Sequence, residues 1–378
     1  MKNLKRAVII GGGIGGLTLA LALRKKGVEA NVFEKYDHYQ NHRTGFLIWS
    51  YAIKVLQELD VPVEKVGAAL EVFEIYGRKG QELAQMPIGQ VSREFGADSY
   101  EINRLRLIKW MSDMVGPDLA QGKNCVSVET FEDRAVAHFE DGSSAEGDVV
   151  IGCDGAHSTV RKFIHENAEL NMFNAGGWIA VNDQHPKDLK PNRHMDYWEP
   201  AIKAGVADIG NGEARWYVGM NGALPSPDRG KKEQIIEAVP VLPEVIQQCM
   251  DLTDEKDMVP VMGGDLLALK PWFKGRVLIL GDAAHATSPY AGMGACAAIA
   301  DCRCLAELTD DCTDITEMFQ RFQDDRKPIT DGIIKHSRDS LHMSSGRSKL
   351  KNWFRDLKMQ HIPDKQMHKI VGDMVNGN

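Results

Sequence analysis

The sequence predicts an α/β fold, in which a Rossmann-like dinucleotide-binding domain carries an inserted antiparallel-sheet domain and a C-terminal helix. Three observations support this prediction. An apolar strand at residues 7–10 turns through glycines straight into an apolar helix. Further strands of the buried, parallel type recur at residues 148–155 and 275–282, and each leads into a helix. Between residues 171 and 264 the pattern changes to short aromatic strands, which is typical of an antiparallel layer.

The glycine turn after the first strand has the spacing of a dinucleotide site. Gly11, Gly13 and Gly16 fill the three positions of the G-x-G-x-x-G fingerprint. The first glycine lets the chain turn, the second lets a pyrophosphate approach the backbone, and the third lets the helix pack on the strand. The phosphates are expected at the helix N-terminus, beside Ile14 and Gly15.

A carboxylate ends the next apolar strand, residues 30–34, about twenty residues further on. In this position Glu34 can hold the adenosine ribose hydroxyls. It argues against a ribose 2′-phosphate, which an arginine would be expected to hold. We therefore predict that Glu34 and the adjacent Lys35 contact the cofactor.

Composition excludes several classes of partner. The 378 residues suit two domains, or one large domain with an inserted layer. With 45 Lys and Arg against 53 Asp and Glu, the net charge of −8 argues against nucleic acid as a partner. The seven cysteines match no metal-ligand spacing, which indicates a reduced, cytoplasmic chain without a metal site. Five glycines break the first apolar run and no later run has membrane-spanning length, so neither a signal peptide nor a membrane partner is expected.

Changes in pattern along the chain predict the domain boundaries. The dinucleotide-binding domain is assigned to three separate segments, residues 1–71, 100–170 and 265–345. The inserted sheet domain, which is expected to wall a substrate pocket, is assigned to residues 72–99 and 171–264. Residues 346–378 form a C-terminal helical tail.

A second carboxylate lies at the end of the third buried strand. Asp282 follows Gly281 there and can accept hydrogen bonds from a polyol. Beyond it, Gly292 and Gly294 precede a helix of small residues at 295–308, whose bare N-terminus suits a group that becomes anionic. Close packing of this helix on the sheet would need the same small residues, so both interpretations stay open.

Three separated motifs together resemble the flavoprotein aromatic hydroxylases, the family typified by para-hydroxybenzoate and salicylate hydroxylases, over roughly residues 5–330. The first motif is the glycine fingerprint with Glu34. The second, Cys153-Asp-Gly-Ala-His-Ser-Thr-Val-Arg161, is similar to the family's D-G-x-x-S-x-x-R signature. The third, Gly281-Asp-Ala-Ala-His285 with Pro289, Gly292, Gly294 and Asp301, resembles its G-D motif.

The resemblance implies a non-covalently bound FAD. It implies that Asp154 and Arg161 serve FAD and the nicotinamide donor, and that Asp282 holds the ribityl chain. Arg104, which from pattern alone is as readily a surface cation, matches the arginine of the family's R-x-x-L helix and is implied to contact FAD. The loop before the small-residue helix adds Pro289, Gly292, Met293, Gly294 and Ala295 as cofactor contacts.

A second glycine fingerprint after a strand is absent from the sequence, so NADH or NADPH is expected to dock transiently at the surface. Arg43 and Arg161 are the candidate cations for this docking. Arg43 lies in a polar loop and is equally readily a solvated cation or a phosphate or flavin contact.

The sequence departs from the family pattern at three places. Gly292-Met-Gly-Ala-Cys296 stands where the family usually shows Gly-Gln-Gly-x-Asn, so an amide is replaced by a thioether and a thiol. Ser50-Tyr51 stands where a Pro-Asn pair is common, and Asp208 lies in a stretch where a proline commonly approaches the flavin. These departures bear on the substrate and on oxygen chemistry, but not on FAD.

The activity implied by the resemblance is that of a monooxygenase. NADH or NADPH reduces FAD, O₂ adds to the reduced ring as a flavin peroxide, and one oxygen atom passes to an aromatic or polycyclic small molecule. A small phenol, a quinolone-like bicycle and a tetracycline-like polycycle all fit. The alternatives are a FAD-dependent reductase or dehydrogenase on the same scaffold, without oxygen insertion, and a non-catalytic flavin-binding protein.

No catalytic base is assigned from the sequence. His157 and His285 lie inside cofactor motifs, where a structural role is the commoner one. The candidate substrate contacts, for which core packing is the alternative, are His194, Tyr197, Tyr217 and Asp208.

The tail pattern predicts an amphipathic helix over residues 348–358. Leu350, Trp353, Phe354 and Leu357 share one face at i, i+3, i+4, i+7 spacing, among basic side chains. We expect this stripe to dock on the protein near the pocket mouth. An anionic membrane surface is the alternative.

Overall fold

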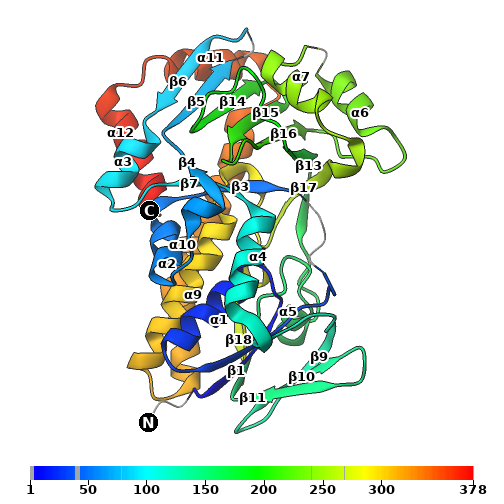
Figure 1. Ribbon diagram of the computed structural model, residues 1–378, viewed down its shortest axis with the longest axis vertical. Helices are drawn as coiled ribbons and strands as arrows, with labels where there is room; N and C mark the ends of the chain where they lie inside the picture. The colour runs from blue at the N-terminus through cyan, green and yellow to red at the C-terminus, as the bar shows by residue number, and fades with distance from the viewer. Residues whose placement is uncertain (1–3, 39–42, 78, 240, 268, 378) are drawn as a thin grey trace.

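The chain forms two layers stacked along the long axis of the molecule (Figure 1). The computed structural model describes residues 4–38, 43–77, 79–239, 241–267 and 269–377. One sheet with its helices occupies the end that holds the N-terminus, and a second sheet occupies the opposite end. The long helix α10 (Ile315–Ser345) contacts elements of both layers.

The first sheet is built around the strand that leads into the glycine turn. β1 (Arg6–Ile10) pairs in parallel with β2 (Glu29–Phe33) on one side and with β12 (Val149–Gly152) on the other. β12 in turn pairs in parallel with β19 (Val277–Ile279). β12 is buried throughout, as expected for a parallel strand covered on both faces. Two short strands complete the sheet, β8 (Leu119–Ala120) and β18 (Phe273–Lys274).

Helices and a small sheet cover this layer. α1 (Ile14–Lys25) packs against α4 (Arg104–Val115) and α9 (Gly294–Asp311). The antiparallel sheet that also packs here consists of β9 (Cys125–Thr130), β10 (Ala135–Phe139) and β11 (Ser144–Gly147), and α5 (Thr159–Ile164) lies beside it.

The second sheet combines strands from two separate stretches of the chain. Within the described residues its order is β17-β13-β16-β15-β14-β5-β6. The first stretch supplies β5 (Val72–Gly77) and β6 (Glu82–Met86). The second supplies β13 (Asn171–Asn182), β14 (Arg193–Glu199), β15 (Ile202–Asp208), β16 (Ala214–Asn221) and β17 (Val259–Asp265). The expected antiparallel sheet is wrong in one detail: β5 and β14 pair in parallel, because β5 enters from a distant part of the chain and not through a hairpin.

The two faces of the second sheet differ. α6 (Lys231–Ala238) and α7 (Glu244–Asp251) pack on one face, where Trp216 and Val206 are fully buried. The other face looks toward α10 and the first layer. The boundaries of the two domains themselves stay a prediction.

Shorter elements fill the junction between the layers. A small sheet there has the order β3 (Gly45–Ile48), β7 (Tyr100–Asn103), β4 (Gly67–Ala69). The helices are α2 (Ser50–Glu58), α3 (Ile88–Glu94) and α8 (Asp282–His285). The described residues also form 3₁₀ turns at Val63–Lys65, Gly116–Asp118, Glu255–Asp257 and Pro289–Ala291.

Two helices follow α10, and one of them, at residues 364–376, was not predicted as a separate helix. α12 (Asp364–Asn376) packs against α2 and α3, with Val371 and Val375 fully buried. α11 (Lys349–Met359) lies at the top of Figure 1, far from the N-terminus. The prediction that its apolar stripe docks on the protein is wrong, because the stripe is exposed. Across the described residues, no helix is long and apolar enough to cross a membrane.

Candidate active site

Three glycines after β1 shape a phosphate site. Gly11 has φ of +104°, and a Cβ there would lie 2.4 Å from the carbonyl oxygen of Cys153. A Cβ at Gly16 would lie 1.9 Å from the carbonyl oxygen of Gly11, so neither position accepts a side chain. At Gly13, by contrast, no described atom lies within 4 Å of the Cβ position. This open space is at the N-terminus of α1, which no described side chain caps, so a pyrophosphate fits there.

Glu34 is fixed beside the glycine turn. Its Oε2 accepts a hydrogen bond from the backbone N–H of Gly12 at 2.7 Å, and its Oε1 accepts one from that of Tyr36 at 3.1 Å. This is the place where a carboxylate can reach an adenosine ribose. The neighbouring Lys35 is exposed, with its ammonium 4.8 Å from the centroid of the Tyr36 ring. Ile14 and Gly15 form the first turn of α1, as predicted.

Asp282 and Arg104 lie close enough for their charges to interact, although 178 positions of sequence separate them. Asp282 opens α8 directly after Gly281, whose φ is +60°. Arg104 opens α4, which the side chain of Asn103 caps. Burial raises the pKa of Asp282, whereas the charges of His285 and Arg104 lower it. A carboxylate and a guanidinium at this edge of the sheet suit the ribityl and phosphate part of FAD.

A buried ion cluster holds the Asp282 turn in place. Asp301, which is fully buried, contacts His285 Nε2 at 2.6 Å, accepts from the Gly281 N–H at 3.0 Å and accepts from Arg326 Nε at 2.7 Å. Burial raises the pKa of Asp301, but the charges of His285 and Arg326 outweigh it and lower that pKa. His285 therefore has the structural role. Arg326, a member of this cluster on α10, was missed from the sequence.

Hydrogen bonds within the second motif, residues 153–161, hold its turn in place. Asp154 accepts hydrogen bonds from Ser158 Oγ at 2.5 Å and from two backbone N–H groups at the start of α5. Arg161 is almost wholly buried, and donates to the carbonyl oxygens of Ala156 at 2.7 Å and Ala283 at 3.2 Å. It therefore ties the second motif to the third. The role expected of Arg161 as a surface cation for the nicotinamide donor conflicts with this burial.

Arg43 lies between the two layers. It pairs with Asp183 of the second layer at 2.7 Å, and one of its nitrogens lies 3.8 Å from Glu213. Its guanidinium is partly exposed, so unlike Arg161 it remains reachable from solvent.

A cavity of about 1010 Å³ lies between the layers. Its first-layer wall is formed by Asp282 and by the loop that contains Pro289, Gly292, Met293, Gly294 and Ala295. Gly292 has φ of +64°, and α9 begins at Gly294 without a cap from any described side chain. A bare helix start facing a cavity fits the ring of FAD. Helices α10 and α12 supply further apolar wall, including Ile329, Met367 and Met374.

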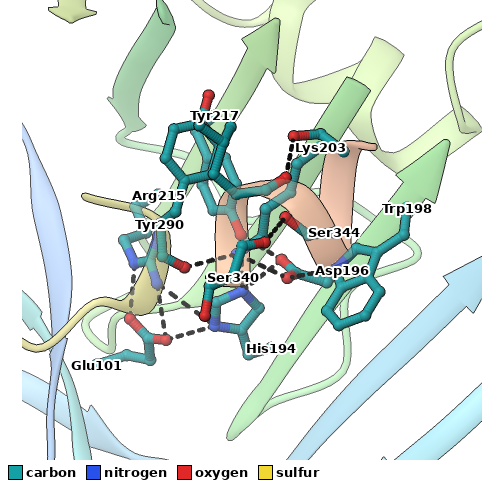
Figure 2. A network of polar contacts seen from close by, with 12 residues as sticks. Glu101, His194, Asp196, Trp198, Lys203, Arg215, Tyr217, Tyr290, Ser340 and Ser344 are labelled. Atoms are coloured by element: carbon teal, nitrogen blue, oxygen red, sulfur yellow. Dashed lines mark hydrogen bonds and ion pairs between the residues drawn. The ribbon is translucent and has the colours of Figure 1, made fainter. Parts of the chain in front are cut away.

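The sheet wall of the cavity carries a polar network (Figure 2). Its geometry follows from strand register. Asp196 on β14 and Tyr217 on β16 lie opposite the same residue of the strand between them, Gly205. A Cβ at Gly205 would lie 2.5 Å from Asp196 Oδ1 and 2.6 Å from the Tyr217 hydroxyl. The glycine therefore lets the two side chains meet, and the Tyr217 hydroxyl donates a hydrogen bond to Asp196.

A second row of the network runs parallel to the first. His194 and Arg215 lie opposite Ala207, again a small residue on the middle strand. Arg215 Nε donates to Glu101 Oε2 at 2.6 Å, and Arg215 Nη2 donates to Glu101 Oε1 at 2.9 Å. His194 lies between two carboxylates, 2.6 Å from Glu101 Oε1 and 3.0 Å from Asp196 Oδ1.

A lysine and a tryptophan complete the contacts of Asp196. Its Oδ2 accepts from Trp198 Nε1 at 3.0 Å, and Lys203 Nζ lies 3.2 Å away. Although burial raises it, the charges of Lys203 and His194 hold the pKa of Asp196 well below its usual range. Burial likewise opposes ionisation of Glu101, but Arg215 and His194 lower its pKa to about 2.

The charged side chains that line the sheet wall make it net positive. Each ring nitrogen of His194 lies beside a carboxylate, and one of these, Glu101, is fully buried and does not line the cavity. Two cations, Lys203 and Arg215, then face the cavity with one carboxylate, Asp196. Burial and the charge of Asp196 raise the pKa of Tyr217 far above its ordinary value, so its phenol keeps its proton.

Two of the four predicted substrate contacts do not line the cavity. Tyr197 lies on the opposite face of β14, since strand residues alternate, and stacks on Tyr76 with ring centroids 5.2 Å apart. Asp208 accepts hydrogen bonds from the backbone N–H groups of Asn192 and Gly210, at 2.7 and 2.9 Å, and so stabilises a turn. His194 and Tyr217 do line the cavity.

Three cavity residues were not predicted from the sequence, Asp196, Lys203 and Arg215, and neither was Glu101, which is buried behind them. A signal for two of them was present. In a strand with period two, Asp196 shares a face with His194, and Arg215 shares one with Tyr217. Glu101 carried no such signal, because its partners lie 93 and 114 positions away in sequence.

Two departures from the family pattern lie against each other. Cys296, in the first turns of α9, is fully buried and accepts a hydrogen bond from the backbone N–H of Trp49 at 3.4 Å. Burial raises the pKa of Cys296 to about 12, so the thiol stays protonated. Burial, together with Cys296 beside it, raises the pKa of Tyr51 well above its ordinary value. Both residues therefore join α9 to α2 as neutral packing groups.

The glycine turn, the ribityl carboxylate and the bare helix over a shared cavity together define a FAD-dependent oxidoreductase of two layers. The chain belongs to the FAD binding domain family, whose model matches residues 5–309. As a member it binds FAD, with NADH or NADPH as electron donor and O₂ as co-substrate.

Curated relatives and solved structures agree with this assignment. The aurachin C monooxygenase/isomerase of Stigmatella aurantiaca is 28% identical over 329 residues, covering 85% of each chain. A FAD-dependent urate hydroxylase of Klebsiella oxytoca is 25% identical over 372 residues, covering 94% of this chain and 95% of the relative. The crystal structure of Klebsiella pneumoniae HpxO with FAD and uric acid has a TM-score of 0.92 at 20% identity, covering 99% of this chain and 97% of HpxO. The chain is a flavoprotein monooxygenase.

Proposed function

We propose that this enzyme hydroxylates an aromatic small molecule that carries a phenolic or enolic oxygen, bound between the α9 start and the polar face of the second sheet. One observation carries the proposal. The same cavity is lined by the predicted flavin-contacting loop, from Pro289 to Ala295, and by a net-positive wall. The wall suits the ionised form of such a substrate, which is the electron-rich form that accepts oxygen most readily.

The hydrogen-bond inventory of the wall supports this substrate class. The oxygens of Asp196 and Glu101 already accept from His194, Arg215, Tyr217, Trp198 and Lys203. Lys203 has three N–H donors, and its contacts with Asp196 and with the Tyr290 carbonyl oxygen, at 3.2 and 3.5 Å, use two. Lys203 therefore has a third N–H group, which carries positive charge, to donate to a substrate oxygen. The carboxylates of Asp196 and Glu101 already accept hydrogen bonds from the protein, so they serve as fixed counter-charges and not as bases.

Each part of the chain then has a task. When bound and reduced, FAD supplies the activation of O₂. Asp282, Arg104, Glu34 and the glycine turn hold the cofactor. Lys203 orients the substrate oxygen and stabilises its charge, while the apolar side chains of α10 and α12 exclude water from the cavity.

The state of the cysteines bears on the cellular compartment of the enzyme. All seven cysteines are free thiols. Burial raises the pKa values of six of them. Free thiols support the proposal of a reducing, cytoplasmic compartment.

The test uses the FAD-loaded full chain with a panel of bicyclic phenols and their O-methyl ethers. We expect the phenols to stimulate NADH or NADPH oxidation and to gain one atom from isotopically labelled O₂, and the ethers to do neither. Lys203→Met should raise KM for the phenols at least tenfold, on the order of a lost charged hydrogen bond. Lys187→Met, an exposed lysine of the same layer, is the control.

Two results would contradict the proposal. Reduction of the substrate without label incorporation would show the reductase alternative. Equal turnover of phenols and ethers, with Lys203→Met unchanged, would remove the role of the positive wall.

A further inference from the structure

The helix α11 is oriented with its apolar face outward. Leu350, Trp353, Phe354 and Leu357 are 66%, 58%, 57% and 44% exposed. They share one face of the helix at i, i+3, i+4, i+7 spacing. Large exposed side chains are common singly, but four on one helical stripe form a contiguous patch.

The opposite face of α11 explains this orientation. Asn352 is buried and its Nδ2 donates to the carbonyl oxygen of Gly346 at 2.7 Å. Arg355 donates to the carbonyl oxygen of Met343 at 2.7 Å, pairs with Asp356, and lies 5.5 Å from the Trp198 ring. Polar contacts therefore hold the helix on the protein and leave the apolar stripe to face outward.

Charge surrounds the stripe on both sides. At 100° per residue, Lys351 and Lys358 border one edge of the stripe and Lys349 borders the other, and all three are exposed. Residues 347–361 hold five basic residues and one acidic residue, a net charge of +4 in a chain whose net charge is −8. An apolar stripe bordered by lysines is the pattern of a helix that lies in the plane of a membrane interface.

We propose that α11 docks the enzyme on an anionic lipid surface, with the stripe in the acyl boundary and the three lysines at the headgroups. A second copy of this chain fits the stripe less well, because pairing two such faces would bring their lysine borders together. The helix α11 lies at one end of the long axis of the molecule (Figure 1), and the four side chains of its stripe are exposed there.

The same helix leads directly into the cavity wall. Met359 ends α11 and lines the cavity, as do Ile362 and Met367 beyond it. On the outer side, Phe354, Leu357, Lys358 and His361 line a shallow hollow. The segment from Met359 to Met367 thus joins the lipid-facing stripe to the wall of the cavity. An apolar substrate dissolved in lipid would therefore lie close to its binding site.

The experiment measures co-sedimentation of the FAD-loaded full chain with phosphatidylcholine vesicles, with and without phosphatidylglycerol. We expect binding to the anionic vesicles only, and weaker binding as salt rises. Trp353→Ser with Phe354→Ser should lower vesicle binding at least about tenfold, because binding scales with buried apolar area. Lys349, Lys351 and Lys358 changed together to Gln should lower it by on the order of a hundredfold, at about fivefold for each lysine.

Matched controls distinguish vesicle binding through α11 from non-specific adsorption of the protein. Ile236→Ser with Leu252→Ser removes two apolar side chains of similar exposure on the α6 and α7 side, and should leave binding unchanged. Lys187, Lys190 and Lys256 changed together to Gln makes the same change in net charge elsewhere. FAD content and turnover of a water-soluble phenol, measured without vesicles, should be the same in all variants.

Three outcomes would overturn the proposal. The first is no binding of the unaltered enzyme to anionic vesicles at low salt. The second is equal binding to neutral and anionic vesicles. The third is self-association without vesicle binding, abolished by Trp353→Ser with Phe354→Ser, which would assign the stripe to a second copy of the chain. Each is read independently of hydroxylation, so failure here leaves the proposed reaction standing.

Discussion

Tyr217 reaches Asp196 across a whole β-strand, because the residue between them is Gly205. The hydrogen bond joins β14 to β16 above β15, and the contact needs the absence of a side chain on the strand in the middle. The cavity wall therefore depends on a residue that contributes no atom to the chemistry.

Gly205→Ala tests this dependence. The new Cβ would lie 2.5 Å from Asp196 Oδ1 and 2.6 Å from the Tyr217 hydroxyl, so one of these groups has to move. We expect a rise in substrate KM of roughly tenfold and a stability loss of about 1–3 kcal/mol, as for overpacking. Steady-state kinetics and urea unfolding check both.

The control is Gly219→Ala, in the same sheet. Its nearest described neighbour would be the Tyr290 hydroxyl at 3.4 Å, a contact close to ordinary packing. If both variants behaved alike, the strand-crossing hydrogen bond would have no special role.

Glu101→Gln tests the buried ion pairs of the wall. It leaves Arg215 and His194 without their buried counter-charge, which costs about 3–5 kcal/mol. Urea unfolding of the FAD-loaded enzyme at neutral pH measures the loss. Glu64→Gln, at an exposed site, should change stability by less than about 0.5 kcal/mol.

The same carboxylate gives a pH dependence with a defined sign. The folded-state pKa of Glu101 is about 2, below the value of about 4.3 in an unfolded chain. Its stabilisation is therefore complete above about pH 4.3 and is lost as the pH falls through the folded pKa. The Glu101→Gln variant should lose less stability than the unaltered enzyme between pH 4 and pH 2, and a steeper loss in the variant would contradict the assignment.

Asp282→Ala tests the cofactor site. Without this carboxylate the ribityl chain loses its acceptor, and we expect purified protein that is largely colourless. The ratio of flavin absorbance to protein measures retention. Asp339→Ala, at an exposed position of α10, should remain yellow, and full FAD retention in Asp282→Ala would remove Asp282 from the site.

Arg43 and Arg161 are expected to respond differently to substitution. Arg161→Ala removes a buried link between two motif turns, so it should lower thermal stability and FAD retention. Arg43→Ala leaves the motifs intact and should raise KM for the nicotinamide donor several-fold. Melting temperature and donor kinetics separate the two, and an unchanged KM in Arg43→Ala would leave the docking site of the donor elsewhere.

Deleting residues 346–378 should destabilise the enzyme and open its cavity. Val371 and Val375 of α12 are fully buried, and each contributes about 1.5–3 kcal/mol. Because α12 also lines the cavity, we expect faster NADPH oxidation without substrate. Trp353→Ser with Phe354→Ser should change neither property, which distinguishes the role of α12 from that of α11.

The local parts of the site could be predicted from sequence, and the non-local parts could not. The glycine turn, Glu34 and Asp282 each lie at the end of a recognisable strand, so short stretches were enough to place them. The meeting of Glu101 with Arg215 depends on strand order, which no short stretch encodes.

The tail shows a different kind of limit. Its amphipathic pattern correctly predicted a helix, but not which face would be buried. That choice depends on acceptors outside the helix, such as the carbonyl oxygens of Met343 and Gly346. For Tyr197, the strand was predicted but not its register, and a shift by one residue moves a side chain to the other face.

The cavity wall joins Trp49 with Met374, residues from opposite ends of the chain, and this has a consequence for synthesis. Chains leave the ribosome at about 5–20 residues per second, and early domains fold first. Both sheets and the glycine turn are therefore translated before α12 emerges. The α12 part of the cavity wall can therefore close only after every strand of both sheets has been synthesised.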